Sequence, residues 1–233
     1  MRSLGYVTRI FDPTRVIVVW DGKGGSANRK NIDPNYKANR ATSRITHWGL
    51  YDTKAEETEA LIGQLFRTKD YLECLPLQQI MMEKLEADDI IAYLAQQADK
   101  NNKKITIVSS DKGVKGLGIK TIISQFPDLV SKPSMTLDYV FQVCEDNLEG
   151  KKIFSKIIHE WDKVETNYKL MNLHDSVLDI KEKNTILDII KEEIPDLQAG
   201  AFLHLLDTDK IEGVTKNTEG WLENFRGLTV FKK

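Results

Sequence analysis

The chain of 233 residues carries 35 acidic and 33 basic side chains, and its formal net charge is −2. With 41% hydrophobic and 29% charged residues, the composition is that of a globular protein with room for one sizeable domain or two modest ones. It excludes a membrane span and a secretory signal, because no apolar run is long enough, so we expect a cytoplasmic protein without a membrane partner.

The first predicted element is a β-branched run over residues 15–20, which is typical of a strand inside a parallel sheet and ends in Asp21. A basic arm follows at about residues 23–50, where Gly24-Gly25 and Pro34 predict a mobile loop or a short helix. Such a local excess of positive charge suggests a partner with localised negative charge, and a solvated loop is the alternative.

Helical spacing of apolar residues predicts an amphipathic helix over residues 54–66. A second strand is predicted around residues 79–82 and leads into the cluster Glu86-Ala87-Asp88-Asp89, which opens a further helix. The short run 105–111 reads as another buried strand, and it too ends in an aspartate, Asp111.

These carboxylates are expected to converge, because sites in open α/β sheets form at the carboxyl ends of parallel strands. Together, Asp21, the cluster at 86–89 and Asp111 would repel one another unless a cation neutralised them, and Mg²⁺ or Mn²⁺ fits oxygen ligands best. The alternative for the cluster alone is an acidic first turn that complements the helix dipole.

The glycine-rich run 113–123 has two functional interpretations and a plain structural one. The preferred interpretation is a tight turn between two short helices, in which backbone N–H groups at Gly116 and Gly118 face a nucleic-acid phosphate and Lys115 and Lys120 add charge. A phosphate loop is a weaker alternative, because one residue intervenes before the lysine. A simple glycine turn is the third.

From about residue 134 the chain is predicted to be mostly helical, with breaks near Pro133, Gly150, Pro195 and Gly213. We expect an α/β core over residues 1–112 and a helical part over residues 113–233. The two cysteines are expected to be reduced structural thiols, and the four histidines, which lack ligand spacing, to be surface or core residues; they are Cys74, Cys144, His47, His159, His174 and His204.

In chain order, these stretches make the protein resemble a 5′ nuclease of the flap endonuclease family, similar to the phage exonucleases and to the 5′-nuclease domain of bacterial DNA polymerase I. The matching motifs span roughly residues 15 to 125; they are Trp20-Asp21-Gly22, Tyr36-Lys37-Ala38-Asn39-Arg40, Glu86-Ala87-Asp88-Asp89 and Ser109-Ser110-Asp111-Lys112. The glycine-rich run resembles the family's helix-three-turn-helix.

This resemblance implies a PIN-like α/β fold with a central, mostly parallel sheet and metal-dependent hydrolysis of DNA near a free 5′ end or flap. The implied ligands of two divalent ions are Asp21, Glu86, Asp88, Asp89 and Asp111. Lys37 and Arg40 would act on the scissile phosphate from an arch. The implied DNA contacts are Arg29, Lys30, Tyr36, Arg44, Lys115, Gly116, Gly118 and Lys120. The glycine turn would also hold K⁺.

The resemblance further implies a monomeric replication protein, of a bacteriophage, that meets other replication proteins. Several family features are missing, however: an aspartate in a first strand, one that follows Asp111 by two residues, and an Asp pair before the glycine run. Lys112 meets Gly113 directly, where the family has a long segment. We expect the joining of separate parts of a longer chain, with a natural or engineered deletion as the alternative.

Three other functions stay open at this level. A branched-DNA-binding protein of the same fold could have lost enough carboxylates to be catalytically impaired. A PIN-type RNA nuclease shares the carboxylates but does not explain the glycine turn. A nucleotide triphosphatase would depend on Lys120.

Overall fold

The structure is a computed structural model that describes residues 1–38, 45–108, 136–149, 152–173 and 177–231. The chain forms two compact units; the first comprises Met1–Lys30, Asn35–Tyr93 and Ser176–Lys233, and the second Asn31–Pro34 and Leu94–Asp175. The predicted boundary between residues 112 and 113 lies outside the described residues and stays a prediction. No helix in the described ranges is long and apolar enough to cross a membrane.

The first unit contains a small parallel sheet of two strands, β1 (Ile17–Trp20) and β2 (Gln78–Met81). Ile17 pairs with Gln78 and Trp20 with Met81, so both strands end at the same edge. The connection between them carries α2 (Ala27–Ile32) and α3 (Lys54–Glu73), and α4 (Ala87–Lys100) follows β2. The predicted parallel pair is confirmed, and the short-helix interpretation of the arm is confirmed for α2.

One predicted strand is wrong over the residues that the structure describes. Residues 103–108 have no strand assignment, and Ile107 and Val108 are more than half exposed. A β-branched run becomes a strand only where its backbone groups find a ladder partner, and the sheet in the described residues has two members. The chain begins with helix α1 (Arg2–Phe11).

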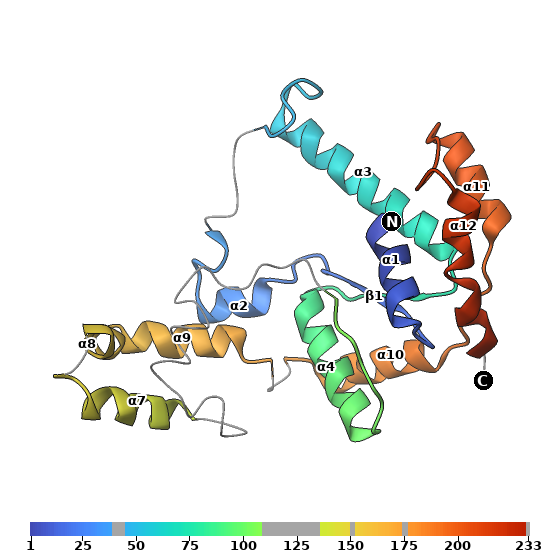
Figure 1. The fold of residues 1–233 in the computed structure, drawn as a ribbon. Coiled ribbons are helices and arrows are strands. Elements are labelled where there is room, and N and C mark those ends of the chain that lie inside the picture. Colours follow the sequence, from blue (N-terminus) through green and yellow to red (C-terminus); the bar gives the residue numbers. More distant parts are fainter. Residues whose placement is uncertain (39–44, 109–135, 150–151, 174–176, 232–233) are drawn as a thin grey trace. The chain divides into compact units, whose positions relative to one another are not determined.

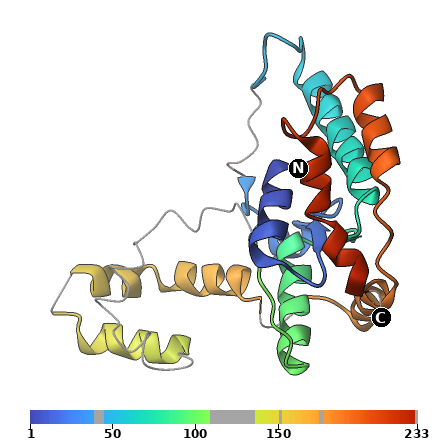
Figure 2. The same cartoon turned by 45° about the vertical axis from the view of Figure 1, so that its right-hand side comes forward.

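The main core lies between the C-terminal half of α3 and the helices at the end of the chain, α11 (Ala199–Thr208), α12 (Thr218–Glu223) and the 3₁₀ helix η2 (Arg226–Phe231). Figures 1 and 2 both show α1, α3, α11 and α12 side by side. Phe202 packs 5.3 Å from the ring of Tyr71, and Trp221 packs 4.8 Å from that of Phe225. This packing joins the C-terminal helices and the start of the chain to α3.

Helix α10 (Ile180–Lys191) is fastened to the start of β2 through its last carbonyls. Gln78 donates to the carbonyls of Ile189 and Glu192 at 2.5 and 3.2 Å, and Arg15 donates to that of Ile190. The last carbonyls of a helix lack their usual partner four residues further on, and here side chains from the sheet donate to them. The contact sets the sheet against the C-terminal helices.

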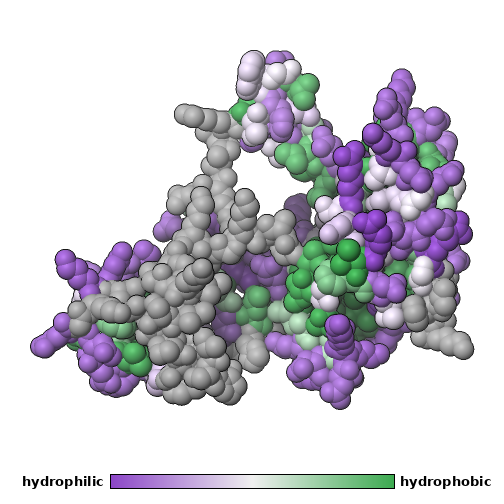
Figure 3. Space-filling model, viewed as in Figure 1, coloured by the Kyte–Doolittle hydropathy of each residue, from purple (hydrophilic) through white to green (hydrophobic). Residues whose placement is uncertain are grey.

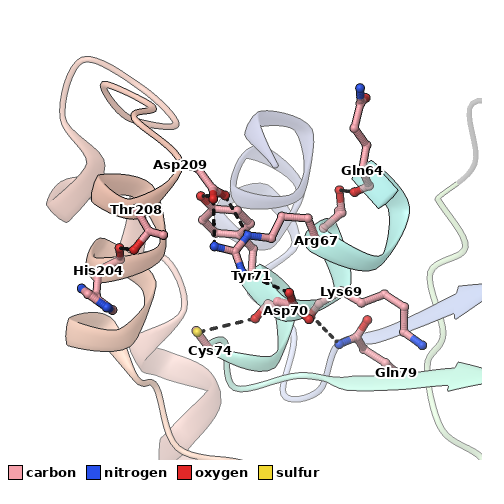
Figure 4. Close-up of polar contacts among 11 residues, drawn as sticks. Gln64, Arg67, Lys69, Asp70, Tyr71, Cys74, Gln79, His204, Thr208 and Asp209 are labelled. Carbon is pink, nitrogen blue, oxygen red and sulfur yellow. Dashed lines mark hydrogen bonds and ion pairs between the residues drawn. The ribbon is translucent and has the colours of Figure 1, made fainter. Parts of the chain in front are cut away.

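A polar network holds α3 to the end of α11, as Figure 4 shows. The Arg67 guanidinium donates to both carboxylate oxygens of Asp209 at 2.8 Å, and the Tyr71 hydroxyl donates to the same carboxylate at 2.8 Å. Burial and the hydrogen bond to Asp209 raise the pKa of Tyr71 to about 12. The network complements the apolar packing between these two helices.

The second unit contains α7 (Leu137–Asp146), α8 (Lys152–His159) and α9 (Trp161–Met171). Its small core is formed by Cys144 and Phe154. Cys74 and Cys144 are both free and buried, and burial raises the pKa of each thiol. The prediction of structural thiols is confirmed, and so is the mostly helical C-terminal part within the described residues.

Replacing Gly5 by alanine is expected to destabilise the fold by about 1 to 3 kcal/mol, the usual cost of overpacking. A Cβ at Gly5 would lie 2.1 Å from Nε1 of the buried Trp221, so α1 would have to move away from α12. Gly63→Ala is the matched control: it lies in α3 with open space around it, and we expect a gain of about 0.5 to 1 kcal/mol. Urea denaturation measures both changes, and equal effects would contradict the proposed clash.

Candidate active site

The carboxyl edge of the β1–β2 sheet brings together Asp21 and the start of α4. Asp21 follows the last residue of β1, and one of its carboxylate oxygens accepts a hydrogen bond of 2.8 Å from the backbone N–H of Ala87. The N–H groups of a first helical turn lack partners within the helix, so an anionic side chain is favoured there. Two stretches 66 residues apart in sequence therefore meet at one place.

Two glycines make this meeting possible. A Cβ at Gly22 would lie 1.6 Å from the carbonyl oxygen of Met82, and one at Gly25 would lie 2.6 Å from that of Leu85. The N–H of Gly22 donates to the Leu85 carbonyl at 2.9 Å. The chain after β1 thus lies directly against the backbone before Glu86, a closeness that side chains would prevent. The motif Trp20-Asp21-Gly22 by itself does not indicate that Gly22 is needed for this close approach of two backbone segments.

Asp89 is held inside the protein by Arg29, which α2 supplies. Both guanidinium Nη atoms donate to the carboxylate, one to each oxygen, at 2.8 Å. Arg29 is 6% exposed and Asp89 5% exposed, so the pair is shielded from solvent. A metal ion at Asp89, or a DNA contact by Arg29, would require this pair to open; both assignments stay predictions.

Glu86 is also buried, at 4% exposure, and three side chains from the arm surround its carboxylate. Lys37 donates to it at 2.9 Å, Tyr36 donates at 3.2 Å, and a guanidinium nitrogen of Arg29 lies 3.3 Å away. Burial disfavours the charged Lys37, but the hydrogen bond to Glu86, the negative charge of Glu86 and the contact with Tyr36 together outweigh it and raise the pKa of Lys37. Lys37 also has a left-handed backbone, with φ of 59°. The arm is therefore held at Lys37 by the carboxylate cluster.

Asp21 and Asp88 differ from the other two carboxylates because they face solvent. Neither forms an ion pair with a residue of the described ranges. Partial burial raises the pKa of Asp88, and the negative charges of Glu86 and Asp21 add to the effect, while Arg29 and Lys37 oppose it. The crowding of these like charges is the condition that a bound cation would relieve.

The described residues fit part of a divalent-metal site. Asp21 and Asp88 offer the oxygen donors that Mg²⁺ and Mn²⁺ prefer. Within the part of the chain that the structure describes, however, no group of three or more acidic, histidine or cysteine side chains is placed to hold a metal ion. A complete site would need at least one further ligand.

The remaining predicted site residues divide into two groups. Lys30 is exposed on α2, where it is free to meet solvent or a ligand's phosphate. The others lie outside the described residues, together with the Lys112–Gly113 junction; they are Arg40, Arg44, Asp111, Lys115, Gly116, Gly118 and Lys120.

Comparison with known proteins gives a consistent result. Residues 1–140 match the family model described as 5′-3′ exonuclease, N-terminal resolvase-like domain. A flap endonuclease Xni of Shewanella sp. (strain MR-4) is 37% identical over 105 residues, which cover 45% of this chain and 34% of the relative. The one from Vibrio vulnificus (strain YJ016) is 29% identical over 113 residues, covering 48% and 38%.

DNA polymerase I of Rhizobium leguminosarum is 28% identical over 195 residues, which cover 75% of this chain and 17% of the polymerase. The chain thus spans about a third of the flap endonuclease of strain MR-4 and about a sixth of the polymerase. No solved structure matches significantly.

Proposed function

The chain belongs to the 5′-3′ exonuclease family, and from this premise we propose that it is a structure-specific 5′ nuclease that hydrolyses DNA phosphodiesters at a free 5′ end or flap. The observation that carries the proposal is the meeting of Asp21 with Glu86 and Asp88 at the carboxyl edge of a parallel sheet. The printed names of the relatives, flap endonuclease and DNA polymerase I, support a DNA substrate and a role in replication.

A divalent ion, Mg²⁺ or Mn²⁺, held by Asp21 and Asp88 would activate a water molecule and stabilise the charge that develops on the phosphate. Asp111 is the proposed further ligand. By similarity to the family, the proposal also includes a second divalent ion and a K⁺ ion bound at the glycine turn.

The arm supplies the proposed phosphate contact through Lys37. Its ammonium group rests 2.9 Å from Glu86, at the border of the cluster, and its long flexible stem lets the charge turn toward a bound phosphate. Positive charge preorganised beside a reacting phosphate stabilises the transition state. Arg29 has a different role in this proposal: by neutralising Asp89 inside the protein, it leaves Asp88 and Asp21 as the outward-facing carboxylates.

Replacing Asp88 by asparagine is expected to lower flap cleavage by about 100-fold or more, because a metal ligand contributes several kcal/mol of charge stabilisation. The measurement is cleavage of a synthetic 5′-flap duplex with and without Mg²⁺. Asp99→Asn, a charge removal at the exposed end of the same helix, is the control and should cut like the wild type. Equal activity of both variants would refute the proposed site.

A second candidate is a branched-DNA-binding protein of the same fold that does not cut. The observation in its favour is that the described residues hold no complete group of metal ligands, while Asp89 is already paired with Arg29. Binding of the flap duplex without turnover at any Mg²⁺ or Mn²⁺ concentration would select this function over the nuclease.

A further inference from the structure

A second buried carboxylate, Glu57 on α3, holds the other described end of the arm. Its two oxygens accept the backbone N–H of Thr46 at 2.9 and 3.1 Å, and one accepts the N–H of His47 at 2.7 Å. The His47 Nδ1 lies 3.0 Å away, and the Lys54 ammonium donates at 2.6 Å. Glu57 therefore binds two consecutive residues at the point where the arm returns to α3.

Packing in the hydrophobic core does not explain why Glu57 is buried. Between Lys54 and Phe66, all of them described, Glu57 is the only buried residue, at 1% exposure. Figure 3 shows hydrophobic surface left uncovered over this part of α3, where Leu61 and Ile62 are at least half exposed. The end of the arm covers Glu57. The contact therefore fixes the position of the arm and does not contribute to the apolar packing of α3.

The contact is charged and continues into an ordered turn. The hydrogen bond from Lys54 outweighs burial, and with those from Thr46 and His47 it lowers the pKa of Glu57 to about 2, so the carboxylate is ionised at neutral pH. After His47 the chain turns back, with Leu50 N–H donating to the His47 carbonyl at 2.9 Å, and enters α3 through the capping box of Thr53 and Glu56.

The two described ends of the arm's central segment are thus each fastened by a buried carboxylate. Glu86 holds Lys37 at one end, and Glu57 holds Thr46 and His47 at the other. Fixing both ends of a segment reduces the conformational entropy that is lost when the segment binds a ligand. A charged ligand would therefore bind to an arm whose position is already fixed at both of these ends.

We propose that Glu57 is a positioning residue for DNA binding: it anchors the C-terminal end of the basic arm on α3, and the affinity for a flap substrate depends on this anchor. The inference rests on the proposed function and extends it from the carboxylate cluster to the far end of the arm. Nothing in the residue pattern around Glu57 distinguishes it from the exposed acidic residues beside it, Glu56 and Glu59.

The test compares Glu57→Gln with Glu59→Gln, which removes the same charge from an exposed position on the same helix. Hydrogen exchange of the Thr46 and His47 amides reports the anchor itself. Anisotropy with a labelled 5′-flap duplex, without divalent metal, reports DNA affinity, and steady-state cleavage separates KM from kcat. Lys54→Met, which removes one partner of Glu57, is a milder second variant that keeps the test decisive if Glu57→Gln does not fold.

We expect Glu57→Gln to accelerate exchange at both amides and to weaken DNA binding about tenfold, because a freed segment has to be ordered when DNA binds. KM should rise by the same factor while kcat stays within about twofold of the wild-type value, since the anchor takes no part in the chemistry. Lys54→Met should show the same changes to a smaller degree, and Glu59→Gln none.

Faster exchange with unchanged DNA affinity would overturn the proposal, because Glu57 would then fasten a surface turn and nothing more. Unchanged exchange would overturn it by showing that the anchor does not exist. Failure of the proposed function is distinguishable from both, since the wild-type protein would then not cut the flap duplex, before any variant is compared.

Discussion

Replacing Arg29 by methionine is expected to lower the free energy of unfolding by about 3 to 5 kcal/mol, the cost of leaving a buried charge without its partner. Arg29 donates to both oxygens of Asp89 and lies 3.3 Å from Glu86, and all three residues are at most 6% exposed. Methionine matches the length of the arginine stem but leaves the buried Asp89 carboxylate without a cation, while Glu86 keeps Lys37. Urea denaturation followed by circular dichroism measures the loss.

Lys30→Met is the matched control, because Lys30 is the next residue of α2 and is exposed. We expect its unfolding free energy to stay within about 0.5 kcal/mol of the wild-type value. Arg29→Lys should restore only part of the stability, since an ammonium group cannot donate to both carboxylate oxygens in the fork geometry of a guanidinium. If Arg29→Met and Lys30→Met proved equally stable, the buried pair would not be the structural element described above.

Replacing Gly22 by alanine is expected to cost about 3 kcal/mol, the upper end of overpacking, and to abolish cleavage as well. The added Cβ would lie 1.6 Å from the Met82 carbonyl oxygen, which is backbone and has no rotamer to escape into. Either β1 or the loop before Glu86 has to move, and each movement separates Asp21 from the Ala87 N–H. A shift of about 1 Å at reacting groups costs about 100-fold in rate.

Gly49→Ala provides the comparison, because a Cβ there would meet open space. The expected result is a stable, active protein for Gly49→Ala and a destabilised, inactive one for Gly22→Ala in the same denaturation and flap-cleavage assays. A fully active Gly22→Ala protein would show that the chain after β1 does not need to lie against the backbone of residues 82–85, and the account of how Asp21 reaches α4 would be wrong.

Local pattern was sufficient for the elements that carry the candidate site. The β-branched run became β1, the strand predicted around residues 79–82 became β2, the cluster at 86–89 opens α4, and Asp21 meets α4 as the rule for parallel strands predicts. The run 105–108 shows where pattern fails: it consists of β-branched residues, as most of β1 does, yet it has no strand assignment. Residue propensity indicates that a segment can form a strand, and the presence of a neighbouring strand to pair with decides whether it does.

The roles of the individual acidic residues needed the folded chain. In sequence, the members of the 86–89 cluster look equivalent, and Glu57 looks like its exposed neighbours Glu56 and Glu59. In the structure, Asp89 is committed to Arg29, Glu86 and Glu57 each hold one end of the arm, and Asp88 faces outward with Asp21. Charge and spacing are local properties, whereas burial and the choice of partner depend on residues distant in sequence, so only the tertiary contacts separate anchors from candidate ligands.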